Sequence, residues 1–230
     1  MKILAFDTSL NKTYISLLTD DVISSKIFIT DEKNYHSAYL ITGIKGILDT
    51  NNTKFPDIDL IAVNKGPGSF TGIRAGVAVA KTMAKELNKN VVGINSLDIL
   101  YKTYENLNPE VILDARKEMF YFRVNDKIEL IPYSEISKHI TKNHIICDTS
   151  SHTRLKTFLD KLNTDIKAQN KTPGNCLTLI NFEDENINLS EALIKIAKSR
   201  FETLKNNDYD SFLWHNLNPM YIQPPPIHGK

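Results

Sequence analysis

The order of hydrophobic patterns along the first hundred residues limits the fold more than any other feature of this chain. Three short apolar runs separated by tight turns come first, each with the length and the β-branched content of a strand. The spacing then changes to that of a helix, and strands and helices alternate from there. The predicted elements are strands at residues 2–6, 13–18 and 22–29, a helix at 37–49, a strand at 60–63, a helix at 71–87, a strand at 91–94 and a helix at 96–106.

Three antiparallel-type strands followed by alternating helices and strands are the order of a ribonuclease-H-like half-domain, the building block of actin-like ATPases and sugar kinases. We therefore predict an α/β protein with the actin-like ATPase (ASKHA) fold and two subdomains. Residues 1–108 form the first, and residues 109–230 form a smaller, reduced second subdomain. Its predicted elements are strands at 111–113, 119–124 and 144–147 and helices near 154–162 and 189–204.

Composition narrows the class of protein. The 230 residues include 41% apolar side chains, enough for a real core, and 28 basic against 27 acidic residues give a formal charge of +1. No global field therefore draws the chain onto nucleic acid. The two cysteines, Cys147 and Cys176, fit no disulfide or zinc spacing, and neither a signal peptide nor a membrane span is apparent. We expect a cytoplasmic protein with reduced thiols and no membrane association.

The segment Asp7-Thr8-Ser9 lies where the first strand ends and a tight turn begins. A carboxylate in that position can hold a hydrated magnesium ion, and the turn's N–H groups can face a phosphate. A turn capped by an aspartate is the alternative, because Asp, Thr and Ser are ordinary turn residues. Both interpretations remain open at this point.

The glycine-rich segment from Gly66 to Gly72 leads into the second predicted helix. Bent backbone with N–H groups at a helix N-terminus suits an anion, whereas a purely structural helix cap is the alternative. The segment is no Walker A loop, because Ile73 and Arg74 follow Gly72 where that motif needs Lys-Ser/Thr. As degenerate phosphate loops we single out Asp7, Thr8, Gly66, Gly68 and Ser69.

The two helices on either side of this segment each have a second face that is small or apolar. A helix of that kind is buried on more than one side. Glycines inside a helix cost about 0.5–1 kcal/mol each relative to alanine, so close approach of another backbone would explain them. Either the second subdomain or a partner protein covers these faces, and we favour a partner. The predicted interface residues are Tyr39, Gly43, Gly46 and Thr50 on the first helix and Ala75, Ala78, Val79 and Thr82 on the second.

No catalytic or metal-binding constellation emerges. His36 precedes the first helix, but it has no His-x-x-x-His partner, and no Gly-x-Ser-x-Gly elbow organises a nucleophile. We predict no catalytic residues and no metal ligands.

Several of these strings together resemble the TsaB (YeaZ) family in order and spacing. The Gly-Pro-Gly-Ser-Phe-Thr-Gly-Ile-Arg string is the most specific of them. The matching segments are Ile3-Leu4-Ala5-Phe6-Asp7-Thr8-Ser9, His36-Ser37, residues 66–74, Asp114-Ala115-Arg116 with Tyr121, and Pro219-Met220-Tyr221-Ile222.

The resemblance implies a non-catalytic bacterial subunit that pairs through its first two helices with the larger paralogue TsaD and acts with the ATPase TsaE. The complex attaches a threonylcarbamoyl group to the adenosine next to the anticodon of tRNAs that read codons beginning with A. A separate enzyme makes the threonylcarbamoyl-adenylate. TsaD performs the transfer, so ATP or ADP and the metal are expected on the partner subunits and no cofactor on this chain. A homodimer through the same helices is a further expectation, and tRNA is contacted through the complex.

Two departures from the family pattern and three alternative functions remain. Glu118-Met119 stand where the family tends to have Gly-Glu, and Gln223 stands in place of an arginine, which puts contacts of the second half with TsaE or tRNA in doubt. The alternatives are a small actin-fold ATPase or kinase and a metallo-glycoprotease. The first would need a second phosphate loop and the second a metal pair or a nucleophile, and neither is found. A self-associating scaffold without a tRNA role is the remaining alternative.

Overall fold

The computed structural model describes residues 1–10, 12–29, 36–125, 127–168 and 177–223. Contacts divide the chain into two compact units, residues 1–99 with 188–230 and residues 100–187. The proline run Pro224-Pro225-Pro226, whose sequence predicts an extended tail, and Cys176 lie outside the described residues. Among the described helices, none is both long and apolar enough to cross a bilayer.

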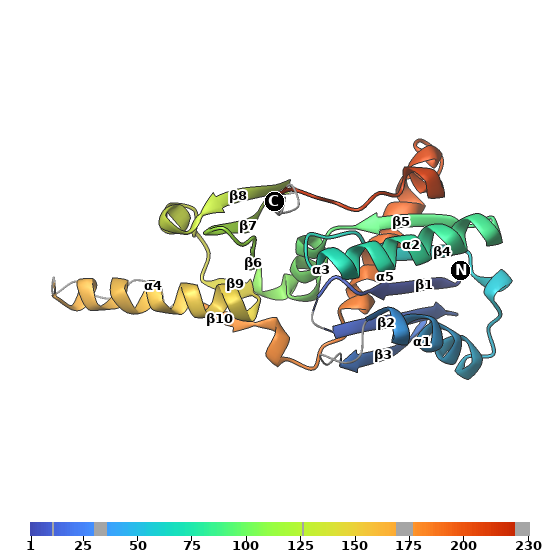
Figure 1. Ribbon diagram of the computed structural model, residues 1–230, viewed down its shortest axis with the longest axis horizontal. Coiled ribbons are helices and arrows are strands. Elements are labelled where there is room, and N and C mark those ends of the chain that lie inside the picture. Colours follow the sequence, from blue (N-terminus) through green and yellow to red (C-terminus); the bar gives the residue numbers. More distant parts are fainter. Residues whose placement is uncertain (11, 30–35, 126, 169–176, 224–230) are drawn as a thin grey trace, which may run out of the picture. The chain divides into compact units, whose positions relative to one another are not determined.

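The first unit contains a five-stranded sheet of order β3-β2-β1-β4-β5 (Figure 1). Strand β1 pairs antiparallel with β2 and parallel with β4, so the sheet is mixed, with the three antiparallel strands at one side. Its strands and α-helices are β1 (Ile3–Asp7), β2 (Lys12–Thr19), β3 (Val22–Ile29), α1 (His36–Thr50), β4 (Leu60–Asn64), α2 (Phe70–Leu87), β5 (Asn90–Ile94) and α5 (Leu189–Leu204). Short 3-10 helices are found at Phe55–Asp57, Tyr209–Phe212 and Trp214–Asn216.

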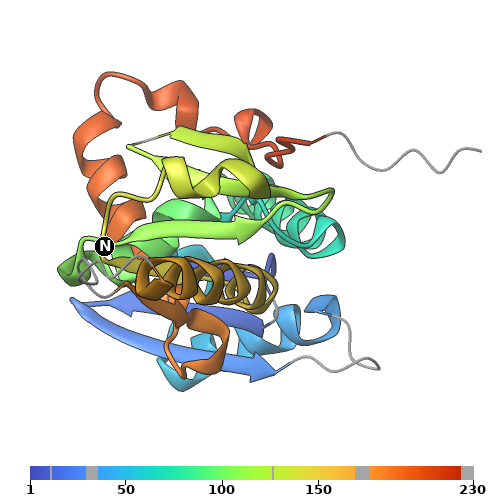
Figure 2. The same cartoon turned by 90° about the vertical axis from the view of Figure 1, so that its left-hand side faces the viewer.

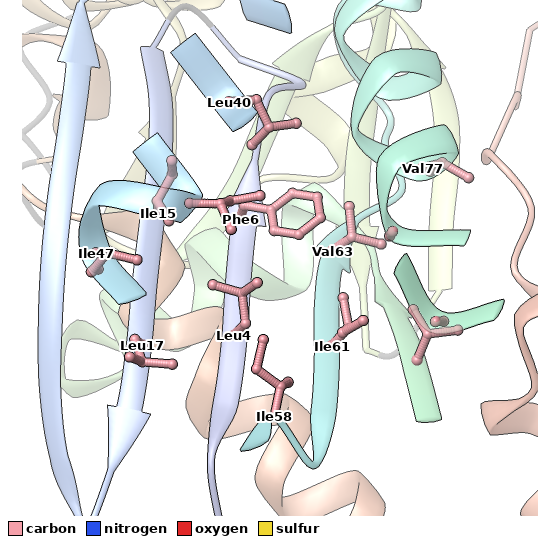
Figure 3. Close-up of a cluster of buried hydrophobic side chains, with 14 of the residues drawn as sticks. Leu4, Phe6, Ile15, Leu17, Leu40, Ile47, Ile58, Ile61, Val63 and Val77 are labelled. Atoms are coloured by element: carbon pink, nitrogen blue, oxygen red, sulfur yellow. The ribbon is translucent and has the colours of Figure 1, made fainter. Parts of the chain in front are cut away.

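Helices α1 and α2 cover one face of this sheet, and α5 covers the other. Figure 3 shows the side chains of Leu4 and Phe6 from β1 and of Ile61 and Val63 from β4 on the face toward α1 and α2. Strand alternation places their sequence neighbours on the α5 face, which is why these strands are buried throughout. Each fully buried Leu, Ile or Phe side chain stabilises the fold by roughly 1.5–3 kcal/mol.

The second unit repeats the strand order of the first. Its sheet has the order β10-β9-β6-β7-β8, so β6, β7 and β8 correspond to the antiparallel strands β1, β2 and β3, and β9 and β10 correspond to β4 and β5. The elements are β6 (Glu110–Asp114), β7 (Met119–Val124), β8 (Lys127–Pro132), β9 (His144–Cys147), α4 (Thr149–Ala168) and β10 (Thr178–Asn181). Short 3-10 helices lie at Glu105–Leu107, Tyr133–Lys138 and Phe182–Asp184.

This second unit is reduced, because the six-residue 3-10 helix Tyr133–Lys138 stands where the first unit has the helix α1. Helix α4 corresponds to α2, packs on β6 and β10, and is seen nearly end-on in Figure 2. Between β5 and β6, helix α3 (Ser96–Thr103) leads from one unit to the next.

The division by contacts differs from the boundary at residues 108 and 109 drawn from the sequence. Helix α5 lies 75 residues beyond β6, yet it packs on the first sheet. There the Ser190 hydroxyl lies 2.7 Å from that of Ser16 on β2, and both are buried. The chain therefore returns to the first unit at Asn188, a long-range packing event with no local signal.

Strands β8 and β10 are absent from the predicted elements. Strand β8 reads Lys-Ile-Glu-Leu-Ile-Pro, an alternation of polar and apolar residues that does indicate an edge strand. Strand β10 has only four residues, too few for an alternating pattern to identify it from the sequence.

Cys147 ends β9 and is a free, buried thiol. Burial, and then the nearby carboxylates of Asp148 and Glu183, raise the pKa of this thiol to about 12. The thiol stays protonated at neutral pH, which fits the expectation of an inert, reduced cysteine.

The turn between β6 and β7 contains one of the departures from the family pattern. Glu118, at the position where the family tends to have glycine, has a backbone φ of 59°. Its neighbours Arg116 and Lys117 also have positive φ. A left-handed conformation costs a residue with a Cβ roughly 1–2 kcal/mol, and glycine avoids most of that cost.

We therefore expect Glu118→Gly to raise the free energy of unfolding by about 0.5–1 kcal/mol, after the greater flexibility of glycine in the unfolded chain is subtracted. Urea unfolding followed by circular dichroism measures the change. The control is Lys127→Gly on β8, which should lower stability by about 0.5–1 kcal/mol because strand backbone needs no positive φ. Equal losses in both variants would contradict the idea that Glu118 is strained.

Candidate functional site

The carboxylate of Asp7 is completely buried at the end of β1. Its Oδ1 accepts hydrogen bonds from the Ser9 backbone N–H and the Ser9 hydroxyl, both at 2.7 Å. Its Oδ2 accepts a 2.7 Å hydrogen bond from the side-chain amide of Asn64. A buried carboxylate needs such partners, and here groups of the chain itself supply them. Asp7 therefore ties a turn together in this structure and faces no open space.

Asn64 and Ser96 are part of the same network, and sequence reasoning missed both in this role. Asn64 ends the buried strand β4, and its Oδ1 accepts hydrogen bonds from the Gly66 N–H at 2.8 Å and the Ser96 hydroxyl at 3.0 Å. The Ser96 hydroxyl also lies 2.6 Å from the Pro67 carbonyl oxygen. A polar side chain at the carboxyl end of an apolar strand was the available signal. Asn95 caps the helix α3 that Ser96 begins, by accepting a hydrogen bond from the Asp98 N–H.

The glycine-rich segment closes directly onto the Asp7-Thr8-Ser9 turn. The Ser69 N–H donates to the Ser9 carbonyl oxygen at 2.7 Å, and the Thr8 hydroxyl donates to the Gly72 carbonyl oxygen at 2.7 Å. A Cβ on Gly68 would overlap the Ser9 carbonyl, and a Cβ on Gly72 would overlap that of Thr8. These glycines therefore allow two stretches of backbone of the same chain to approach each other.

The N-terminus of α2 is capped from within. The Ser69 hydroxyl accepts a hydrogen bond from the Gly72 N–H at 3.3 Å, and the Ile73 N–H donates to the Ser69 carbonyl oxygen at 2.8 Å. The two segments predicted as phosphate loops thus meet, as a phosphate site would require. They fill the space between them with their own backbone and side-chain groups, which we call the closed double loop (residues 7–9 and 66–72).

The C-terminal tail adds a third segment. The Met220 N–H donates to the Lys65 carbonyl oxygen at 2.7 Å, just before the closed double loop begins. The exposed rings of Tyr221 and Phe70 lie 5.3 Å apart, and the Arg74 guanidinium lies 5.2 Å from the Phe70 ring. Three segments far apart in the sequence, all of them part of the family resemblance, therefore meet at the start of α2.

A cavity of about 600 Å³ lies beside this junction, between β5, the end of α5 and the tail. Lys65 and Arg200 line it, together with Leu217, Met220 and Tyr221. Burial first, and then the Arg200 guanidinium, lower the pKa of the Lys65 ammonium, whereas the Asp98 carboxylate raises it. Arg200 is itself ion-paired with Asp98 at 3.2 Å.

On α2, the predicted interface residues lie on the outward side of the helix. Ala78 and Thr82 are exposed, and Ala75 is partly buried. Val79 is also partly buried, because its side chain packs against the core cluster beneath α1 and α2. Arginine at Val79 would therefore disturb the core as well as an outer face, and Ala78 is the better position to probe that face.

On α1, the structure corrects the interpretation of the glycines. Gly43 is buried, and a Cβ there would lie 2.5 Å from Ile15 Cδ1 and 2.8 Å from a Phe28 ring carbon. A Cβ on Gly46 would meet the Lys26 ammonium at 3.3 Å. These glycines therefore face β2 and β3 and let α1 lie close to the sheet, so close approach of a partner is not needed to explain them.

The other two predicted positions on α1 differ from each other. The Tyr39 ring stacks on Phe28 with centroids 5.8 Å apart, whereas Thr50 is exposed and donates to the Gly46 carbonyl oxygen. Ile41, with 54% of its surface exposed, is an outward apolar residue that sequence reasoning did not name. The side chain of His36 lies outside the described part of the chain. Within the described part, no group of three or more His, Cys, Asp or Glu residues has the geometry of a metal site.

Comparisons with known proteins agree on one family. The model of the TsaD family, described as tRNA N6-adenosine threonylcarbamoyltransferase, matches residues 26–143, just over half of the chain. The chain is 35% identical over 123 residues to the tRNA threonylcarbamoyladenosine biosynthesis protein TsaB of Bacillus subtilis strain 168, an alignment that covers 53% of each protein. It is 30% identical over 97 residues to the protein of the same name from Escherichia coli K12, covering 42% of this chain and 41% of that protein. The chain thus spans about half the length of the curated relatives it matches.

The fold comparison covers nearly the whole chain. YeaZ from Pseudomonas aeruginosa matches with a TM-score of 0.71 over 96% of this chain and 99% of that one, at 18% identity. This likeness concerns the fold and confirms the prediction of an α/β protein with two actin-like halves, the second one reduced. With the family model on half of the sequence and the relatives named above, the chain belongs to the TsaB (YeaZ) family, which shares the TsaD family model.

Proposed function

We propose that this chain is a non-catalytic subunit in the biosynthesis of threonylcarbamoyladenosine in tRNA. In this proposal it pairs with a TsaD-like paralogue, which carries out the transfer, and works with a TsaE-like ATPase. The names of the curated relatives support the pathway, and the match to the TsaD family model supports a paralogous partner of the same fold.

The observation that carries the non-catalytic role is the closed double loop. An actin-like ATPase needs a carboxylate that reaches bound magnesium and glycines that leave room for phosphate. In this chain the Asp7 carboxylate is buried and accepts hydrogen bonds from Ser9 and Asn64. The carbonyl groups of Ser9 and Thr8 fill the space beside Gly68 and Gly72. The same geometry argues against the ATPase or kinase alternative, since opening the loop would break this whole network.

The pairing surface in this proposal is the outward side of α1 and α2. Ile41, Ala78 and Thr82 are exposed there, and small side chains on α2 leave room for a helix to lie against it. ATP or ADP and the metal would be held on the partner subunits, and tRNA would be contacted through the complex. Whether a homodimer of this chain uses the same surface is measured by the same pairing experiment described in the Discussion.

Depletion of the chain in its source organism tests the function. Threonylcarbamoyladenosine is expected to disappear from bulk tRNA, as quantified by mass spectrometry of the nucleosides, because the transferase lacks its partner. Re-expression of the wild-type chain should restore the nucleoside. Normal levels of the nucleoside in cells from which the chain is absent would rule out the proposed role.

A further inference from the structure

The cavity of about 600 Å³ beside β5 lies within the first unit, and the proposed function gives it no role. Strand β5 is the last strand of its sheet, so one of its edges is free of other strands. Val92 and Gly93 belong to opposite faces of the sheet, yet both line the cavity, so the cavity takes in this free edge. Groups from both faces of the sheet can therefore meet in it. Its volume falls in the range that holds a drug-sized molecule.

Lys65 brings a positive charge without a partner to this cavity. A Cβ on Gly93 would lie 2.9 Å from the Lys65 Cδ, so the lysine stem runs beside the edge of β5 and its ammonium ends in the cavity that both residues line. Within the described part of the chain, no carboxylate pairs with this ammonium and no group accepts a hydrogen bond from it. Lys65 is partly exposed, and its nitrogen is not among the fully enclosed polar atoms, so a ligand in the cavity can reach it.

The charged groups around Lys65 do not neutralise it. Burial and the Arg200 guanidinium lower the pKa of Lys65, and the Asp98 carboxylate offsets only part of this effect. Asp98 is itself paired with Arg200 at 3.2 Å. Asp208 also lines the cavity, but it is exposed, so water screens its carboxylate. Among the described groups, one half-buried cation is thus left without a matching anion, which suits a singly charged ligand.

The Gly93 N–H is a second donor directed at the same cavity. The Lys65 N–H donates to the Ile94 carbonyl oxygen at 2.9 Å, so the backbone groups of Ile94 face β4. The N–H and C=O of one strand residue point to one side and those of its neighbour to the other, so the Gly93 N–H points to the free edge. It forms no hydrogen bond with any other described segment. The lysine ammonium and a free backbone N–H are therefore available side by side.

Much of the remaining lining is apolar and comes from Leu204, Phe212, Leu217, Met220 and Tyr221. From this arrangement we propose that the cavity binds a small organic carboxylate with an apolar or aromatic body. The carboxylate accepts hydrogen bonds from the Lys65 ammonium and the Gly93 N–H, and the body lies against the apolar side chains. A phosphate monoester carries about 1.5–2 negative charges, more than this one cation offsets. The proposal does not rest on the tRNA-modification role.

NMR titration of the isotope-labelled chain with matched probes tests the site. The probes are 3-phenylpropionate, 3-phenylpropanol, which has the same body without the charge, and acetate, which has the charge without the body. The wild-type chain is expected to bind 3-phenylpropionate at least about tenfold more tightly than either of the others, the size of a hydrogen bond to a charged group. The Gly93 amide resonance should shift along the same binding curve. In Lys65→Met the preference for the acid over the alcohol should vanish, because methionine keeps an unbranched apolar stem and loses the charge.

The matched control is Lys195→Met, which removes an exposed lysine of α5 and should leave binding of every probe unchanged. Melting temperatures verify folding, and Lys65→Met should be at least as stable as the wild type because a half-buried cation is removed. The proposal is overturned if 3-phenylpropionate does not bind or binds no more tightly than 3-phenylpropanol. It is also overturned if the Gly93 resonance does not respond, if folded Lys65→Met keeps the wild-type preference, or if Lys195→Met loses that preference as well.

Discussion

Replacing Gly72 by alanine is expected to lower the free energy of unfolding by about 3 kcal/mol or more, at the upper end of what overpacking a well-packed site costs. The added methyl group would overlap the carbonyl oxygen of Thr8, which is backbone and cannot swing aside. Moving apart would also break the hydrogen bond from the Thr8 hydroxyl to the Gly72 carbonyl. For a chain of this length the melting temperature should fall by roughly 6–12 °C.

Gly46→Ala is the matched control, because it adds the same methyl group to a glycine inside a helix of the same unit. Among the described residues, the one close neighbour of that Cβ is the Lys26 ammonium, the far end of a flexible side chain, at 3.3 Å. Alanine is a better helix former than glycine, so this variant should be unchanged or more stable by up to about 1 kcal/mol. Urea unfolding of both variants measures the difference.

The result decides what the glycine-rich segment does. If Gly72→Ala unfolds early while Gly46→Ala does not, the double loop is closed in solution as it is in the structure. If Gly72→Ala is as stable as the wild type, the loop stands open, and the argument against a phosphate site in this chain fails.

The second large effect concerns pairing with a TsaD-like partner. Ala78→Arg is expected to weaken this complex at least about 100-fold while the chain stays folded. The guanidinium would have to be desolvated in a close-packed contact without an acceptor, a cost of several kcal/mol. In the free chain Ala78 is exposed, so the arginine points to water and stability should change little. Calorimetric titration of the purified partners measures the affinity, and size-exclusion chromatography with light scattering shows whether any homodimer is lost with it.

Two further arginine variants serve as controls for the pairing measurement. Ser199→Arg places the same side chain on an exposed position of α5, on the other face of the sheet, and should leave pairing intact. Val77→Arg, on the buried side of α2 where only 2% of the residue is exposed, should prevent folding. Normal pairing by folded Ala78→Arg would place the interface elsewhere on the chain.

Much of the fold could be predicted from the sequence because it rests on local periodicity. The bounds of β7, β9 and α5 agree with the predicted residues 119–124, 144–147 and 189–204. The order of strands and helices along the first unit follows from the same patterns, since alternation and helical spacing each mark a buried face within a few residues. The two loop segments could also be named, because residues 7–9 and 66–72 each follow a buried strand.

The tertiary structure decided which groups each of these unusual residues contacts. A small residue on a helix signals close approach but not by what: Gly43 accommodates Ile15 and Phe28 of its own sheet, whereas exposed Ala78 leaves room for another chain. An aspartate after a strand signals a need for partners, and only the fold brings Asn64 and Ser9 to Asp7. The sequence by itself determined which residues are unusual for their element, because propensity and periodicity are local. Whether a residue serves packing, capping or binding was decided by contacts between distant segments, such as the contact between Ser16 and Ser190, 174 positions apart, which no local pattern records.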